Sequence, residues 1–206
     1  MREGRVELIS VGAKTWLGVA ITMVVLAFLA LLQLEFMNQA GLVSFRSLEV
    51  ELSSGGGFMG ASLTLQLLGM LAALLAVIYL HEGLHYLAAK VLGVEAKILP
   101  VVAELWRLKI PYAFSLAYSK ATKGQYFAIA LAPQIISAAL LALTVALKHS
   151  SFPYFLYFVH LVSSGGDVYG MVYTLAKFRL SPVMLSCVVK GGKIEAIRVE
   201  YVKNRR

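Results

Sequence analysis

Four long segments of the chain carry almost no charged residues, and this feature constrains the fold more than any other. About 20 helical residues cross the hydrocarbon core of a bilayer, at a rise of about 1.5 Å per residue. Of the 206 residues, 59% are hydrophobic and only 15% are charged, and the mean hydropathy is +0.77. This composition excludes an ordinary soluble domain. We predict an all-α polytopic integral membrane protein, with the lipid bilayer surrounding about four transmembrane helices at residues 16–34, 58–80, 125–147 and 152–176.

The basic residues predict which ends of these segments face the cytoplasm. Lysine and arginine accumulate in cytoplasmic loops. They are frequent in residues 90–123 and in the tail, residues 177–206, and three precede the first segment, whereas the loop between the first two segments holds only Arg46. We therefore predict that both termini and the 90–123 loop are cytoplasmic. Basic loops also account for the net charge of +8, so we expect no nucleic-acid partner.

A short part of the 90–123 loop has the alternation of a β-strand. Apolar and basic residues alternate over residues 106–110, and Pro100 and Pro111 stand on either side. A strand over residues 105–110 could pair with an extended substrate along its free edge, or it could belong to a closed structural hairpin.

The tail predicts a β-hairpin. Residues 187–190 and 194–202 flank Gly191 and Gly192, which suit a two-residue turn. Together with the first strand they predict a small cytoplasmic β unit. Because no repeat or linker interrupts the chain, we predict one membrane domain over residues 1–206. Cys187, the single cysteine, is interpreted as a small filler residue.

A metal-binding motif lies at the end of the second apolar segment, where the chain reads His81-Glu82-Gly83-Leu84-His85. On a helix, side chains four residues apart share one face, so both imidazoles can bind one ion. Imidazole suits Zn²⁺, and three protein ligands leave one position open for water. The neighbouring Glu82 is then placed to accept the proton of that water as a catalytic base. Ionisable groups are costly in apolar spans, which argues for a functional role.

Asp167 is the predicted third metal ligand, because it is the chain's one aspartate and lies inside the fourth apolar segment. His81 and His85 stand nine and five residues before Lys90, and Asp167 stands ten before Lys177, so the three side chains share a similar depth.

Several neighbouring residues are secondary candidates. His160 is a weaker candidate as a ligand or supporting residue, and more simply a hydrogen-bonded interior histidine. Gly83, Gly166 and Gly170 predict close helix packing. Pro133-Gln134 indicates either a helix kink or a contact to the substrate or to a ligand.

These residues resemble the intramembrane metalloproteases of the site-2 protease type and, more closely, the small zincin-type membrane peptidases of prokaryotes. The resemblance lies in residues 81–89, 131–133 and 164–167 and covers roughly residues 80–169. It implies zinc-dependent hydrolysis of peptide bonds within or near the bilayer of a prokaryotic cell membrane. The substrate would be a membrane protein or a peptide.

Two other functions compete with a protease. A haem or redox protein would use His81, His85, His149 and His160 as axial ligands, and would need histidines paired across helices at one depth. A transporter or structural protein with a metal site would leave Glu82 without a role.

Overall fold

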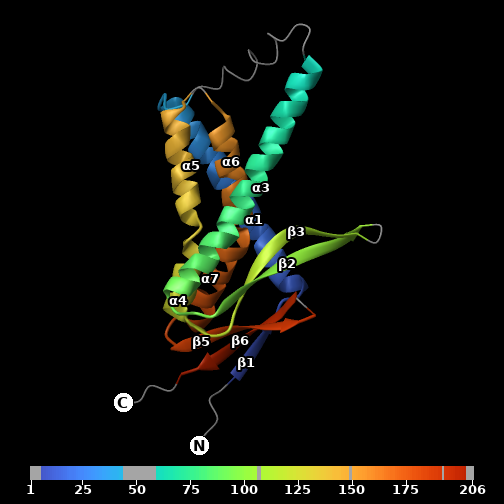
Figure 1. Ribbon diagram of the computed structural model, residues 1–206. Coiled ribbons are helices and arrows are strands. Elements are labelled where there is room, and N and C mark those ends of the chain that lie inside the picture. The colour runs from blue at the N-terminus through green and yellow to red at the C-terminus, as the bar shows by residue number, and fades with distance from the viewer. Residues whose placement is uncertain (1–5, 44–58, 106–107, 149, 192, 203–206) are drawn as a thin grey trace, which may run out of the picture. The chain divides into compact units, whose positions relative to one another are not determined.

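The computed structural model describes residues 6–43, 59–105, 108–148, 150–191 and 193–202. Most of these residues are helical, and a smaller number form two antiparallel sheets (Figure 1). The two longest helices of the described residues are α1 (Ala13–Gln39), which contains the first predicted span, and α3 (Met59–Val91), which contains the second except for residue 58, outside the described residues. The HExxH motif therefore continues the helix of the second span without interruption.

The third and fourth predicted spans are both broken. The third consists of α4 (Lys123–Leu131) and α5 (Gln134–Ala146), separated by Ala132 and Pro133. The interruption agrees with one of the two expectations for Pro133-Gln134, a disturbed helix, since proline cannot donate the backbone hydrogen bond that a continuous helix needs.

The fourth predicted span consists of α6 (Phe152–Ser163) and α7 (Gly165–Phe178). They meet at Ser164, whose backbone N–H and side-chain hydroxyl both donate to the carbonyl of His160. Such a side-chain bond back to the preceding turn favours the end of a helix.

Three helical stretches in the described residues are long and apolar enough to cross a membrane: Ala13–Gln39, Leu67–Val91 and Lys123–Ala146. The helices of the fourth predicted span, with 12 and 14 residues, fall short of that length. The structure thus supports a mostly helical membrane protein with three such helices, and the count of four is not confirmed.

The larger sheet has the strand order β1-β6-β5-β4, which Figure 1 shows with the blue β1 beside the red β6. Its central pair is β5 (Val183–Lys190) and β6 (Lys193–Tyr201), in which Lys190 is opposite Lys193, and Gly192 lies outside the described residues. Gly191, which follows Lys190, has φ +57°, a conformation that glycine adopts without strain. The predicted hairpin is therefore confirmed. The outer strands, β1 (Val6–Ser10) and β4 (Ala121–Thr122), were not predicted.

The smaller sheet corrects the prediction for the 90–123 loop. It pairs β2 (Ala96–Leu105) with β3 (Leu108–Tyr118), and residues 106 and 107 lie outside the described residues. The single strand predicted over residues 105–110 is wrong, because Leu105 and Leu108 belong to two strands that pair with each other. Pro100 and Pro111 lie inside these strands, which a ribbon of two strands tolerates because each strand has an outer edge that needs no donor.

The chain contacts divide into two compact units. The first consists of Met1–Thr22, His81–Pro133 and Gly166–Arg206, and its core includes Ala89, Phe178, Leu185 and Val199. It contains both sheets, α4, the metal-binding motif and most of α7.

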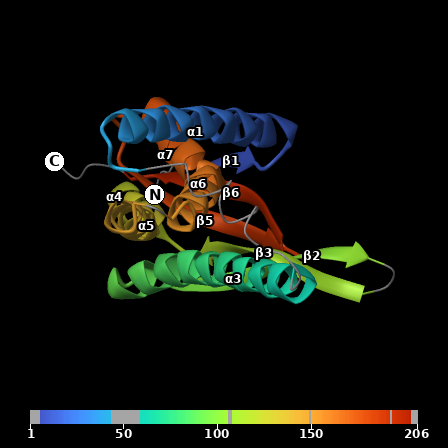
Figure 2. The ribbon, with the colours of Figure 1, turned by 90° about the horizontal axis from the view of Figure 1, so that it is seen from above.

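The second unit consists of Met23–Leu80 and Gln134–Gly165. Its core includes Met37, Tyr154 and Tyr157, and α5 packs beside α6 (Figure 2). The prediction of one domain is not tested by this division.

Candidate metal centre

The two histidines of the motif face each other on α3. Their ring centroids are 4.7 Å apart with an interplanar angle of 83°, and their Nε2 atoms are 3.1 Å apart. This proximity follows from helix geometry, since residues four apart lie one above the other. His85 is buried, with 5% of its surface exposed.

Asp167 approaches both histidines from α7. Its Oδ2 lies 3.2 Å from Nε2 of His81 and 3.3 Å from Nε2 of His85. Asp167 stands in the first turn of α7, because the chain breaks at Ser164 and the helix restarts at Gly165. The positive end of the helix dipole stabilises a carboxylate at this position. The helix break therefore places the acidic group favourably.

The three ligand atoms form a nearly equilateral triangle with sides of 3.1, 3.2 and 3.3 Å. Zinc binds nitrogen and oxygen at about 2.0–2.2 Å in tetrahedral sites, which puts two of its ligand atoms roughly 3.3–3.5 Å apart. The triangle is close to that size. A hydrogen-bonded arrangement fits less well, because two Nε2–H groups donating to one carboxylate oxygen would point towards each other. The donor set therefore fits zinc, and among the described residues it is the one group of at least three such side chains that could hold an ion.

A backbone carbonyl fixes the tautomer of His85. Its Nδ1 lies 2.7 Å from the carbonyl oxygen of Ile129 in α4. Because a carbonyl oxygen can only accept, Nδ1 must carry the proton, and the lone pair of Nε2 is then free to bind a metal. Sequence reasoning missed Ile129, since a residue that acts through its backbone leaves no mark in its side-chain type.

Glu82 has a side chain that suits a catalytic base. Its Oε2 atom is buried and makes no hydrogen bond in the part of the chain that the structure describes. Buried carboxylate oxygens are normally paired, and a catalytic role or a bound ion is one explanation for an unpaired one. Glu82 also directly follows His81 on α3. The orphaned oxygen thus adds to the fit of this site to a hydrolytic metal centre.

A family model described as "Putative zincin peptidase" matches residues 74–181, which is more than half of the chain. The chain belongs to this family. The matched residues contain the histidine motif, α4 and Asp167, so all side chains of the candidate centre lie inside the family domain. Neither curated proteins nor solved structures gave a match.

His160 and Gln134, two secondary candidates of this zincin-family chain, lie in the second unit and make hydrogen bonds there. His160 is almost completely buried, and its Nδ1 lies 2.8 Å from the Ser137 hydroxyl. It is the interior, hydrogen-bonded histidine that the simpler interpretation predicted. The side-chain oxygen Oε1 of Gln134 accepts a hydrogen bond from the same Ser137 hydroxyl. The buried Nε2 of Gln134 makes no hydrogen bond among the described residues. His149 lies outside the described residues.

The prediction for the glycines is only partly confirmed. A Cβ added at Gly83 or Gly166 would meet no neighbouring atom of the described residues within 4 Å, so the described structure shows no close packing at these two positions. At Gly170 an added Cβ would clash with the Tyr126 hydroxyl. The absence of a side chain at Gly170 thus lets α7 pack closely against α4.

Proposed function

We propose that the chain is a zinc-dependent endopeptidase that hydrolyses peptide bonds within or near the bilayer. The observation that carries this proposal is the triangle of His81 Nε2, His85 Nε2 and Asp167 Oδ2, with sides of 3.1–3.3 Å. Family membership and the three apolar helices support it. Zinc in such a site supplies Lewis acidity and makes water nucleophilic at neutral pH.

The protein side chains have separate roles in this mechanism. His81, His85 and Asp167 would hold the metal. Glu82 accepts a proton from the attacking water and returns it to the leaving amine, as general base and then general acid. Its buried, unpaired Oε2 is available for this transfer. The Ile129 carbonyl keeps His85 in the metal-binding tautomer.

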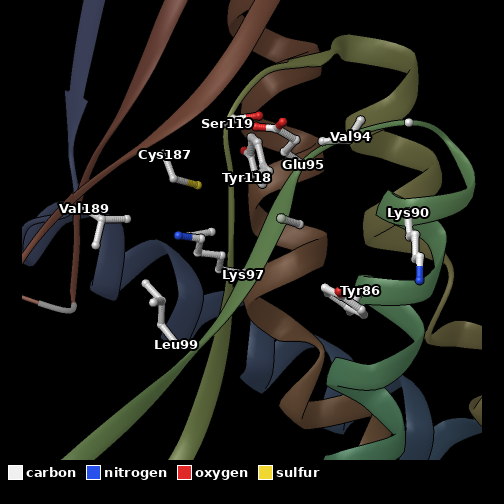
Figure 3. A pocket seen from close by; sticks show the side chains of 13 residues that line it. Tyr86, Lys90, Val94, Glu95, Lys97, Leu99, Tyr118, Ser119, Cys187 and Val189 are labelled. Carbon is white, nitrogen blue, oxygen red and sulfur yellow. The ribbon is translucent and has the colours of Figure 1, made fainter.

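An open cavity of about 1040 Å³ offers a place for an extended substrate chain. In Figure 3, Tyr86 and Lys90 project from α3 on one side of β2, and Cys187 and Val189 lie on the other. Tyr86 directly follows the metal ligand His85. Within the described residues β2 pairs with β3 alone, so its other edge can bind a peptide backbone. Main-chain pairing would hold the scissile segment extended without requiring a fixed sequence.

The substrate class and the location complete the proposal. We propose a membrane protein or membrane-bound peptide as substrate, since the metal-binding helix α3 continues one of the apolar spans. From the distribution of lysine and arginine we propose that both termini and the 90–123 loop face the cytoplasm. The resemblance to prokaryotic membrane peptidases supports the further proposal that the membrane is a prokaryotic cell membrane.

The decisive experiment combines metal analysis with product identification. The full chain is reconstituted in liposomes with a library of single-span peptides, and new peptide termini are identified by mass spectrometry. The parent should contain about one zinc per chain and release products, and Glu82→Gln should contain the zinc and release products more slowly by about 10²-fold or more. If the parent contains zinc but releases no products, the chain is a metal-binding protein without peptidase activity. A parent without zinc would refute the proposal.

A further inference from the structure

The Ile129 carbonyl is available to His85 because of a local feature of α4. In an α-helix each carbonyl accepts the N–H of the residue four positions later. For Ile129 that residue is Pro133, which has no N–H. The Ala132 N–H is shared, at 3.1 Å from the Ala128 carbonyl and 3.3 Å from that of Ile129. The Ile129 carbonyl thus keeps only a long bond inside its own helix.

The imidazole of His85 provides the missing strong donor. Its Nδ1 lies 2.7 Å from the Ile129 oxygen, shorter than the 3.3 Å bond from Ala132. His85 and Pro133 are both buried, so water does not compete for the carbonyl. A carbonyl without its helical partner is normally costly in such surroundings, and the imidazole removes that cost.

A second contact holds α4 against the end of α3. The side-chain amide of Gln125 donates from Nε2 to the carbonyl of Leu92, at 2.9 Å, one residue after α3 ends. The same amide accepts the backbone N–H of Thr122 through Oε1 in a capping box. Because both ends of this amide are used, its orientation is fixed. The start of α4 and the Ile129 carbonyl are therefore both anchored to the metal-binding helix.

We propose that Pro133 is a positioning residue for the metal centre: it withholds the N–H that would pair with Ile129, so this carbonyl instead fixes the Nδ1 proton and the ring orientation of His85. The inference rests on the proposed role of His85 as a metal ligand. It gives Pro133 a function beyond a helix kink. Replacing Pro133 by a residue with an N–H lets the carbonyl turn back along the helix axis and weakens the support of His85.

Two replacements at the same position separate the missing N–H from the pyrrolidine ring. Pro133→Ala adds an N–H. Lactic acid at position 133, introduced by nonsense suppression, has the shape of alanine but an ester oxygen in place of the N–H. Pro153→Ala is the matched control, because Pro153 lies in the first turn of α6, where the N–H has no partner inside the helix.

Zinc affinity of the full chain is measured by competition with a chromophoric chelator, and Co²⁺ absorption reports ligand geometry. Pro133→Ala should weaken zinc binding about 10- to 100-fold and shift the Co²⁺ bands, as is usual when the partner of a ligating histidine is lost. The lactic acid variant and Pro153→Ala should resemble the parent.

The inference is overturned if Pro133→Ala binds zinc like the parent, or if the lactic acid variant loses as much affinity as Pro133→Ala. The second result would assign the effect to the ring and hence to the kink. Failure of the proposed function looks different. If the metal site is wrong, the parent itself binds no zinc, and if only the peptidase activity is wrong, the parent binds zinc but releases no products.

Discussion

His85 and Asp167 lie 3.3 Å apart, from Nε2 to Oδ2, although 82 positions separate them in the chain. Asp167 reaches His85 from the first turn of a helix that begins only because the preceding helix ends at Ser163. This relationship makes the site a property of the folded chain, and it sets the first test.

Asp167→Ala should reduce zinc affinity by more than the 10- to 100-fold that is typical of residues that only support a ligand. Two nitrogen ligands remain, and three protein ligands are the usual number in catalytic sites. Zinc content after dialysis against a weak chelator measures the effect. His160→Asn is the control, since His160 is buried against Ser137 in the second unit and should not affect the metal. Equal zinc content in Asp167→Ala and the parent would exclude Asp167 as the third ligand.

Glu82→Gln should leave zinc content unchanged and reduce peptide hydrolysis by about 10²-fold or more. Glutamine keeps the shape of the side chain but cannot accept the proton of the attacking water. Both quantities must be measured on one preparation, because an inactive protein without zinc has a different explanation. Activity near that of the parent would contradict the proposed mechanism, and loss of zinc would assign Glu82 a structural or ligand role.

The exposed edge of β2 should contact the substrate. A photo-crosslinking amino acid at Ile98, which is 40% exposed, should capture a single-span peptide substrate in the Glu82→Gln background. The same group at Leu8 on β1, a second outer strand with 64% exposure at this position, should capture much less. Equal capture at the two positions would argue against a substrate strand on β2.

The positions of Ala40 and Lys120 test the orientation of the chain. Single cysteines at these exposed positions, in a Cys187→Ser background, should react with a membrane-impermeant maleimide from opposite sides. Ala40 is preferred to Gly41, because Gly41 has φ +69° and would be strained by a side chain. Labelling of both positions from one side would contradict the predicted topology.

Cys187 should behave as a structural residue. Burial raises the pKa of its thiol, although hydrogen bonding with Tyr118 opposes the shift. Iodoacetamide should therefore react more slowly with the folded protein than with the unfolded chain at pH 8, because the thiolate is the reactive form.

The pH dependence of stability checks the same group. The neutral thiol is favoured in the folded state, so the unfolded chain loses its proton first as the pH rises. Stability is therefore full below the ordinary thiol pKa and falls as the pH rises towards the folded value. Cys187→Ala should flatten this part of the curve of unfolding free energy against pH. An unchanged slope would show that ionisation of the thiol contributes nothing to the pH dependence of the unfolding free energy.

Local patterns were sufficient to predict several elements from the sequence. Helix α3 and the pairing of His81 with His85 follow from a spacing of four residues, and the β5–β6 hairpin follows from Gly191-Gly192 between two apolar runs. These features depend on neighbours in the chain, and residue type alone is informative about them. Asp167 was also predicted from the sequence to join the two histidines, since a carboxylate in an apolar segment is costly without a function.

Tertiary structure decided the features that depend on distant partners. The strands β2 and β3 meet across residues 106–107, and a pattern confined to 106–110 could not show that two strands share it. Strand β1 exists because β6 pairs with it nearly 200 residues later in the chain.

The support of His85 by Ile129 is the clearest case of such dependence. The sequence alone determined that His81, Glu82, His85 and Asp167 are present at suitable spacing, and it offered a helix kink as one of two interpretations of Pro133. Only the folded chain brings the carbonyl freed by Pro133 to within 2.7 Å of the His85 imidazole. A hydrogen bond to a backbone atom depends on position and orientation in space, and residue type does not encode either.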